Sequence, residues 1–262
     1  MKKKTRDVLS VLFAAVFLFS AGMMIRQQVQ YHEIVIDSGE AAQVAGIQKG
    51  EKPRQPVHSP QNPLPEEAAH LAGVNLDALR EINGDIVGWI EIPGTDISYP
   101  LLQGQDNQFY LIHNWKKEES AGGSVFLEIT SSRSLTDFNT IVYAHRMRNE
   151  TMFGTLKYYE EPDFWREHPS VYIVLEDAVC RYDIFSAQKA GLREIVYRLD
   201  IEEKGLEEEF IRWCVENSVI DTGLVPEAED RILTLSTCTG GGYAKRWIVQ
   251  GVLAQIYDRE NV

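Results

Sequence analysis

Residues 85–102 read DIVGWIEIPGTDISYPLL, which is two short apolar runs, 86–92 and 97–102, on either side of Pro93-Gly94. Both runs are rich in isoleucine and aromatic residues, which favour strands. Proline followed by glycine is a turn signal. The stretch therefore predicts a β-hairpin, and it opens a series of similar runs along the chain.

Six further β-rich runs follow the hairpin. They cover residues 124–128, 140–144, 171–176, 180–188, 231–237 and 246–257. Eight such strands favour a closed or nearly closed barrel, because closure removes the unpaired edges of a sheet. Helical spacing interrupts the strands at 152–159, 163–168 and 201–218, and a further helix is expected before them at 65–82. We expect a mainly β fold, an eight-stranded barrel with an N-terminal helix and helical insertions.

The N-terminus carries a membrane-targeting pattern. Lys2, Lys3, Lys4 and Arg6 precede an uncharged apolar stretch, residues 8–25, and about eighteen such residues are enough to span a bilayer core as a helix. Basic residues on the N-terminal side predict that this end stays in the cytoplasm. We expect residues 1–30 to form a basic cytoplasmic tip and one transmembrane signal anchor. A cleaved signal peptide is the alternative, since Ser20, Ala21 and Gly22 are small enough for a cleavage site.

The next segment has the composition of a linker. Residues 31–65 are rich in Gln, Gly and charge, and prolines recur from Pro53 to Pro65. Such a composition disfavours regular structure, so we expect a weakly ordered extracytoplasmic tether over 31–62. The folded domain is then expected to cover 63–262. The prediction is a single-pass protein of the cell membrane with its domain outside the cytoplasm.

Charge and cysteine content exclude several classes of protein. The formal net charge is −13, whereas binding to nucleic acid needs a basic face, so we expect no nucleic-acid partner. Three cysteines, Cys180, Cys214 and Cys238, are too few for a disulfide scaffold. We expect the first two to be buried thiols, with a disulfide between them as the alternative. The scattered histidines and acidic residues show no metal-site spacing, and we expect neither a metal nor another cofactor.

Three reactive residues lie at the ends of predicted strands. Cys238 closes the run TLSTC (234–238), Arg246 opens the next run, and His145 closes the run IVYAH (141–145). A thiol needs a nearby cation or base to become a thiolate at neutral pH. A histidine can supply that base and later return the proton. The combination predicts a site for acyl transfer through a cysteine nucleophile.

The pattern resembles the class B sortases, the membrane-anchored cysteine transpeptidases of Gram-positive bacteria. The resemblance rests on DIVGWIEIPGTDISYPLLQGQDNQFYL (85–111), on IVYAH followed by Met152-Phe153-Gly154, on TLSTC with Arg246 after it, and on the helix expected before the strand at residue 231. By this resemblance Cys238 is the nucleophile, His145 the general acid or base, and Arg246 the cation that steadies the substrate carbonyl or the oxyanion.

Substrate contacts are also implied by the resemblance. The residues expected to line the peptide groove are Asn107, Leu111, Tyr143, Ser236 and Thr237. Tyr143, His145, Ser236 and Cys238 would share one face if their segments are strands, because side chains alternate along a strand. The segment 191–197 is expected to form one wall. Leu111 and Tyr143 remain candidates for barrel packing instead.

The resemblance implies a reaction in two steps. Cys238 would cleave a C-terminal sorting motif of secreted proteins, and the acyl group would pass to an amine of a lipid-linked peptidoglycan precursor. Three alternatives stay open: a pilin-polymerising sortase, a peptidase that uses water as the acceptor, and a catalytically silent, membrane-tethered peptide-binding module. The amine found in the product, and the dependence of turnover on Cys238, distinguish them.

Overall fold

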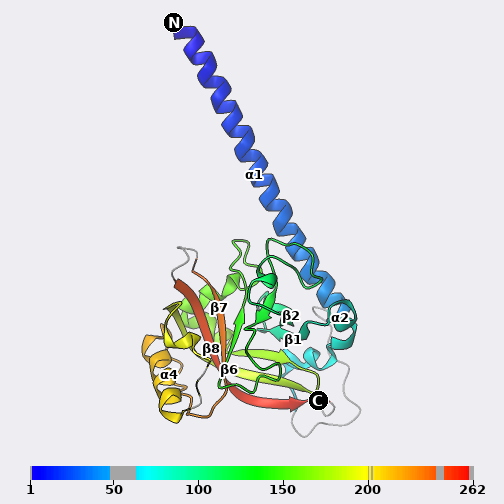
Figure 1. Cartoon of the computed structure of the whole chain (residues 1–262), viewed down its shortest axis with the longest axis vertical. Helices are drawn as coiled ribbons and strands as arrows, with labels where there is room; N and C mark the ends of the chain where they lie inside the picture. The colour runs from blue at the N-terminus through cyan, green and yellow to red at the C-terminus, as the bar shows by residue number, and fades with distance from the viewer. Residues whose placement is uncertain (1, 48–62, 200, 202, 240–244, 260–262) are drawn as a thin grey trace.

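The structure is a computed structural model that describes residues 2–47, 63–199, 201, 203–239 and 245–259. Eight strands form a closed barrel in the order β1-β2-β3-β4-β7-β8-β6-β5, which confirms the predicted fold (Figure 1). The strands are β1 Ile86–Glu91, β2 Ser98–Leu102, β3 Val125–Leu127, β4 Asn139–Tyr143, β5 Ser170–Val174, β6 Ala178–Gly191, β7 Ile232–Cys238 and β8 Lys245–Asp258.

The predicted hairpin is formed by β1 and β2. The Ile92 amide donates to the Ile97 carbonyl at 2.9 Å, and Gly94 in the turn has a φ of +78°, a backbone conformation that glycine adopts without steric cost. Alternate residues of the strands then fill the barrel, as Val142, Leu235 and Val249 do in the main core cluster. The opposite face of β6, β7 and β8 packs against α4 Lys204–Asn217.

The remaining helical segments are short. They are η1 Glu66–Gly73, α2 Leu76–Ile82, η2 Phe109–Leu111, η3 Gly154–Glu160, α3 Pro162–Glu167 and η4 Ile195–Tyr197. The expected single helix over 65–82 is two segments, because Val74 is extended and Asn75 starts a new helix by accepting a hydrogen bond from the Ala78 amide at 3.0 Å. The expected helical insertions are present between β4 and β5 and between β6 and β7, with boundaries shifted by a few residues.

The prediction that the chain is weakly ordered from Tyr31 onward was wrong for residues 31–44. Helix α1 runs without a break over Lys2–Val44. Its last turns are held against the barrel, since Ile34, Ala41 and Ala45 are buried and the Trp115 indole donates to the Asp37 carbonyl at 3.1 Å. Packing of an apolar face commonly outweighs weak helix propensity in this way. The proline-rich residues 48–62 of the expected linker lie outside the described residues.

The N-terminal part of α1 leaves the barrel with its apolar stretch exposed. Side chains such as Phe13, Phe17 and Leu18 are at least 70% exposed, and the helix projects away from the barrel (Figure 1). The segment Val11–Val44 is long and apolar enough to cross a membrane. By its length and composition this exposed apolar helix is a candidate membrane span, as the predicted anchor requires.

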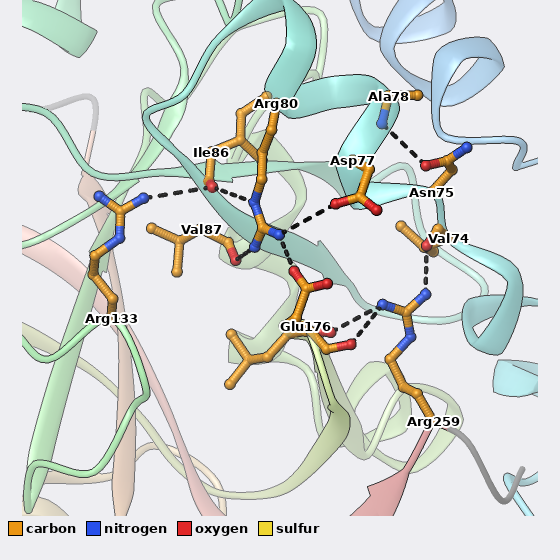
Figure 2. A network of polar contacts seen from close by, with 11 residues as sticks. Val74, Asn75, Asp77, Ala78, Arg80, Ile86, Val87, Arg133, Glu176 and Arg259 are labelled. Carbon is orange, nitrogen blue, oxygen red and sulfur yellow. Dashed lines mark hydrogen bonds and ion pairs between the residues drawn. The ribbon is translucent and has the colours of Figure 1, made fainter.

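A network of arginines joins the segment before β1 to the end of β8 (Figure 2). Arg259, which follows β8, donates to the carbonyls of Ala72 and Val74 before α2 and of Leu175 and Glu176 after β5. Arg80 of α2 donates to the carbonyls of Ile86 and Val87 and pairs with Glu176. Burial, with the charge of Arg80 nearby, lowers the pKa of Arg259. The network fastens the helical entry segment onto the barrel.

Candidate active site

Cys238 and Arg246 face each other across two neighbouring strands. Cys238 is the last residue of β7, Arg246 is the second of β8, and the two are register partners in the antiparallel pair. Both side chains are partly exposed. The pairing of β7 with β8 therefore places residues 238 and 246 side by side where the two strands meet the rim of the barrel.

His145 reaches the same rim from β4. Strands β4 and β7 are parallel, and Tyr143 is the register partner of Ser236. The two chains stay attached beyond that pair, because the Ala144 amide donates to the Ser236 carbonyl at 3.4 Å and the Thr237 hydroxyl donates to the Ala144 carbonyl at 2.8 Å. His145 and Cys238 each follow the Tyr143–Ser236 pair by two residues on adjoining segments, so they lie at one edge of the sheet.

The imidazole of His145 has a fixed orientation. Its Nε2 lies 2.7 Å from the Leu111 carbonyl oxygen; since a carbonyl can only accept, Nε2–H is the donor. The carbonyl of His145 in turn accepts from the Phe153 amide at 2.9 Å. With Nε2 occupied, Nδ1 is the ring nitrogen available for proton exchange. Leu111 thus contacts the site through its backbone.

Glu128 is a buried carboxylate that the sequence analysis did not single out, and it lies beside two predicted groove residues, Asn107 and Tyr143. Glu128, which follows β3, accepts from the Asn107 side chain, while the Ile129 amide donates to Asn107 Oδ1 at 2.9 Å. Burial, together with the Glu128 charge, raises the pKa of Tyr143. Glu128 is 6% exposed and holds Asn107 in place beside Tyr143. The sequence feature that could have identified Glu128 is an acidic residue at the end of a buried strand.

Tyr197 closes the site from η4, at the end of the wall expected over 191–197. Its hydroxyl is 2.8 Å from Ser236 Oγ. Burial raises the pKa of the Tyr197 phenol, the bond to Ser236 and the charge of Arg246 lower it, and the charge of Cys238 raises it. The Ser236 hydroxyl is therefore already hydrogen-bonded to Tyr197, on the face of β7 that also carries Cys238.

Thr237 lies on the other face of β7. Its side chain is buried, it is the register partner of the core residue Trp247, and its hydroxyl is used by the Ala144 carbonyl. This placement gives Thr237 a part in joining β4 to β7 beside the reactive residues.

The other two cysteines are free and buried, so the disulfide alternative is wrong. Burial raises the pKa of the Cys180 thiol to about 11 and that of the Cys214 thiol to about 12. The described residues contain no group of three or more His, Cys, Asp and Glu side chains that could hold a metal ion.

We expect a small alkylating reagent at pH 7 to modify one of the three cysteines of the native chain, namely Cys238, because thiolate character and exposure control the reaction. Peptide mapping by mass spectrometry after a short exposure measures this, and the denatured chain, in which all three react, is the control. Comparable native labelling at Cys180 or Cys214 would contradict the burial described here.

Comparisons with known proteins agree with this geometry. A model of the sortase domain matches residues 90–254. Sortase B of Listeria monocytogenes is 35% identical over 182 residues, which are 68% of this chain and 73% of that protein. The Staphylococcus aureus sortase B–substrate complex has a TM-score of 0.64 and 32% identity and covers 70% of this chain and 84% of its own.

A second solved structure extends the match. Sortase B from B. anthracis in complex with AAEK1 has a TM-score of 0.69 and 29% identity, and the alignment covers 87% of this chain and 99% of that chain. The family model spans more than half of the chain, and the relatives named sortase B share its barrel. The chain therefore belongs to the sortase family and, within it, to the class B sortases.

Proposed function

We propose that this sortase anchors secreted proteins to the cell wall, cleaving their C-terminal sorting motif through a thioacyl intermediate on Cys238 and passing the acyl group to an amine of a peptidoglycan precursor. The observation that carries the proposal is the meeting of Cys238, Arg246 and His145 at the ends of three neighbouring strands. A nucleophile, a cation and a proton carrier are the groups that acyl transfer requires.

In the first step the Cys238 thiolate attacks the backbone carbonyl carbon of the threonine in the sorting motif. Arg246 and a backbone N–H stabilise the negative charge that develops on the carbonyl oxygen. The peptide C–N bond then breaks, and protonated His145 gives its proton to the departing amine, whose peptide tail leaves. The hydrogen bond from Nε2 to the Leu111 carbonyl supports Nδ1 as the nitrogen that carries this proton.

In the second step an amine attacks the thioester carbon. His145 takes a proton from the amine as the new C–N bond forms, and the C–S bond breaks to restore the Cys238 thiolate. A solved sortase B in complex with triglycine supports an acceptor that presents a glycine amine. The lipid-linked precursor would supply such an amine at the membrane surface.

The groove residues position the peptide in this proposal. Asn107, held by Glu128, retains one amide hydrogen for a substrate carbonyl, and Tyr143 and Leu111 offer apolar surface beside it. The S. aureus sortase B–substrate complex supports peptide binding on this fold. Ser236 and Tyr197 border the position where the scissile bond would lie.

The anchor fits the same reaction. With the basic N-terminus in the cytoplasm and a helix through residues 8–25, the catalytic domain, which we place at 63–262, would lie outside the cytoplasm. Protein substrate, lipid-linked precursor and enzyme would then meet at one membrane surface, which raises their effective concentration.

The test uses the full chain in detergent beside its Cys238→Ala variant, incubated with sorting-motif peptides, with and without oligoglycine or diaminopimelate-type amines. We expect peptide cleavage and a mass-shifted acyl adduct in the parent chain, both absent in the variant, and an amine-linked product when amine is added. Product formed only with water would assign a peptidase. Peptide binding without turnover would assign a silent binding module, and a preference for a lysine side chain would assign pilin polymerisation.

A further inference from the structure

A row of buried polar side chains crosses the sheet below the active site. Gln188 of β6 donates to Gln250 of β8 at 2.9 Å, Gln250 donates to the Thr234 hydroxyl of β7 at 3.0 Å, and that hydroxyl donates to Asn139 Oδ1 of β4 at 2.7 Å. Each of the four residues is at most 2% exposed. All the hydrogen bonds run in one direction, so each can strengthen the next.

The row lies on the face of the sheet that carries the nucleophile. Thr234, Ser236 and Cys238 are alternate residues of β7 and therefore point to the same side. Their register partners on β8 are Gln250, Ile248 and Arg246. The floor of the active site thus continues under η4 and α4, where apolar neighbours such as Phe210 and Val196 seal it from water.

Asn139 ends the row and grips η4. Its Nδ2 donates to the carbonyls of Val196 and Arg198, both at 3.0 Å, on either side of Tyr197. Both amide hydrogens of Asn139 are used, and its oxygen accepts from Thr234, so the orientation of the amide is determined. Asn139 therefore holds the backbone on both sides of Tyr197, and the Tyr197 hydroxyl lies 2.8 Å from Ser236 Oγ.

We propose that Asn139 is a positioning residue of the active site: it holds the η4 backbone so that the Tyr197 hydroxyl stays at Ser236, two residues before Cys238 on the same face of β7. The inference rests on the proposed acyl transfer for its catalytic consequence. A polar row is costly to bury unless each group is paired, and here its last pair of hydrogen bonds is spent on the wall of the site. A displacement of about 1 Å in such a wall is enough to lower the rate by about a hundredfold.

The experiment compares the full chain in detergent with Asn139→Ala, with Tyr197→Phe and with the double variant. Ser186→Ala is the matched control, because Ser186 is equally buried and donates to the Cys214 carbonyl of α4 at 2.9 Å rather than to η4. Amide hydrogen exchange is followed over residues 192–199 and over the barrel strands. Acylation by a sorting-motif peptide and alkylation of Cys238 by a small reagent are measured in parallel.

We expect Asn139→Ala to speed exchange in residues 192–199 about tenfold, the factor that corresponds to a net loss of about 1.4 kcal/mol for the two hydrogen bonds to η4. Acylation kcat/KM should fall about tenfold, while alkylation of Cys238 stays within about twofold. In the Tyr197→Phe background the same change should lower kcat/KM only about twofold, because the two residues act through one element. Ser186→Ala should leave both exchange in 192–199 and acylation unchanged.

Unchanged exchange in 192–199, or exchange that rises equally across the barrel, would overturn the proposal. So would additive losses in the double variant, or faster exchange at η4 with unchanged acylation. If the parent chain acylates none of the peptides, the proposed function fails. Amide hydrogen exchange over residues 192–199 still decides, by itself, whether Asn139 holds η4. Asn139→Leu, which has a similar shape and no donor, gives the same exchange test if the alanine variant does not fold.

Discussion

Replacing His145 by alanine is expected to lower kcat/KM for acyl-enzyme formation about a thousandfold, the scale of a lost general acid–base group. The departing amine is a poor leaving group without a proton, and His145 lies next to Cys238 at the ends of the paired segments of β4 and β7. The change also removes the base that favours the thiolate. The fold should persist, because His145 is partly exposed and the variant loses little beyond the hydrogen bond to the Leu111 carbonyl.

Single-turnover acylation measured from pH 5 to 10 checks this prediction. His168→Ala is the control, since the His168 ring bonds the Pro93 carbonyl at 2.8 Å and lies outside the site. A loss below tenfold for His145→Ala would mean that another group carries the proton.

The barrel was predictable because its strands follow local rules. Each run is short, rich in β-branched or aromatic residues and bounded by turn residues such as Pro93-Gly94, and closure follows from their number. The path of α1 was not predictable by the same means. Its last turns are helical because Ile34 and Ala41 pack on the barrel, a contact that depends on the folded domain and leaves little trace in composition.

The active site divides in the same way. Cys238, His145 and Arg246 stand at strand ends, where their residue types alone indicate chemistry. Asn139, Thr234 and Gln250 occupy the polar positions of alternating strands, which in a sequence have the appearance of solvent-facing positions. The structure covers them with η4 and α4, and only that cover gives them a role. Glu128 had a sequence signal, as an acidic residue at the end of a strand, but its partner Asn107 comes from a distant loop and the pairing is visible only in the structure.

Replacing Arg259 by methionine is expected to lower the free energy of unfolding by about 3 kcal/mol, since it breaks several charge-assisted hydrogen bonds and leaves three partly buried carbonyls without this donor. Arg259 joins the end of β8 to the carbonyls of Ala72 and Val74 and to those of Leu175 and Glu176 (Figure 2). Methionine keeps most of the apolar stem, so the loss reports the guanidinium. For a domain of this size the corresponding fall in Tm is about 6 to 12 °C.

Thermal unfolding of the full chain in detergent, followed by circular dichroism, measures the effect. Arg166→Met is the matched control: Arg166 is 62% exposed and pairs across one helical turn with Asp163, so its loss should change the free energy of unfolding by less than about 0.5 kcal/mol. Arg259→Lys separates charge from geometry, because one ammonium group cannot reach carbonyls on both sides as the planar fork does. A lysine variant as stable as the parent would show that charge alone suffices, and an unchanged Tm for Arg259→Met would mean that the entry helices are held by their apolar contacts with the barrel.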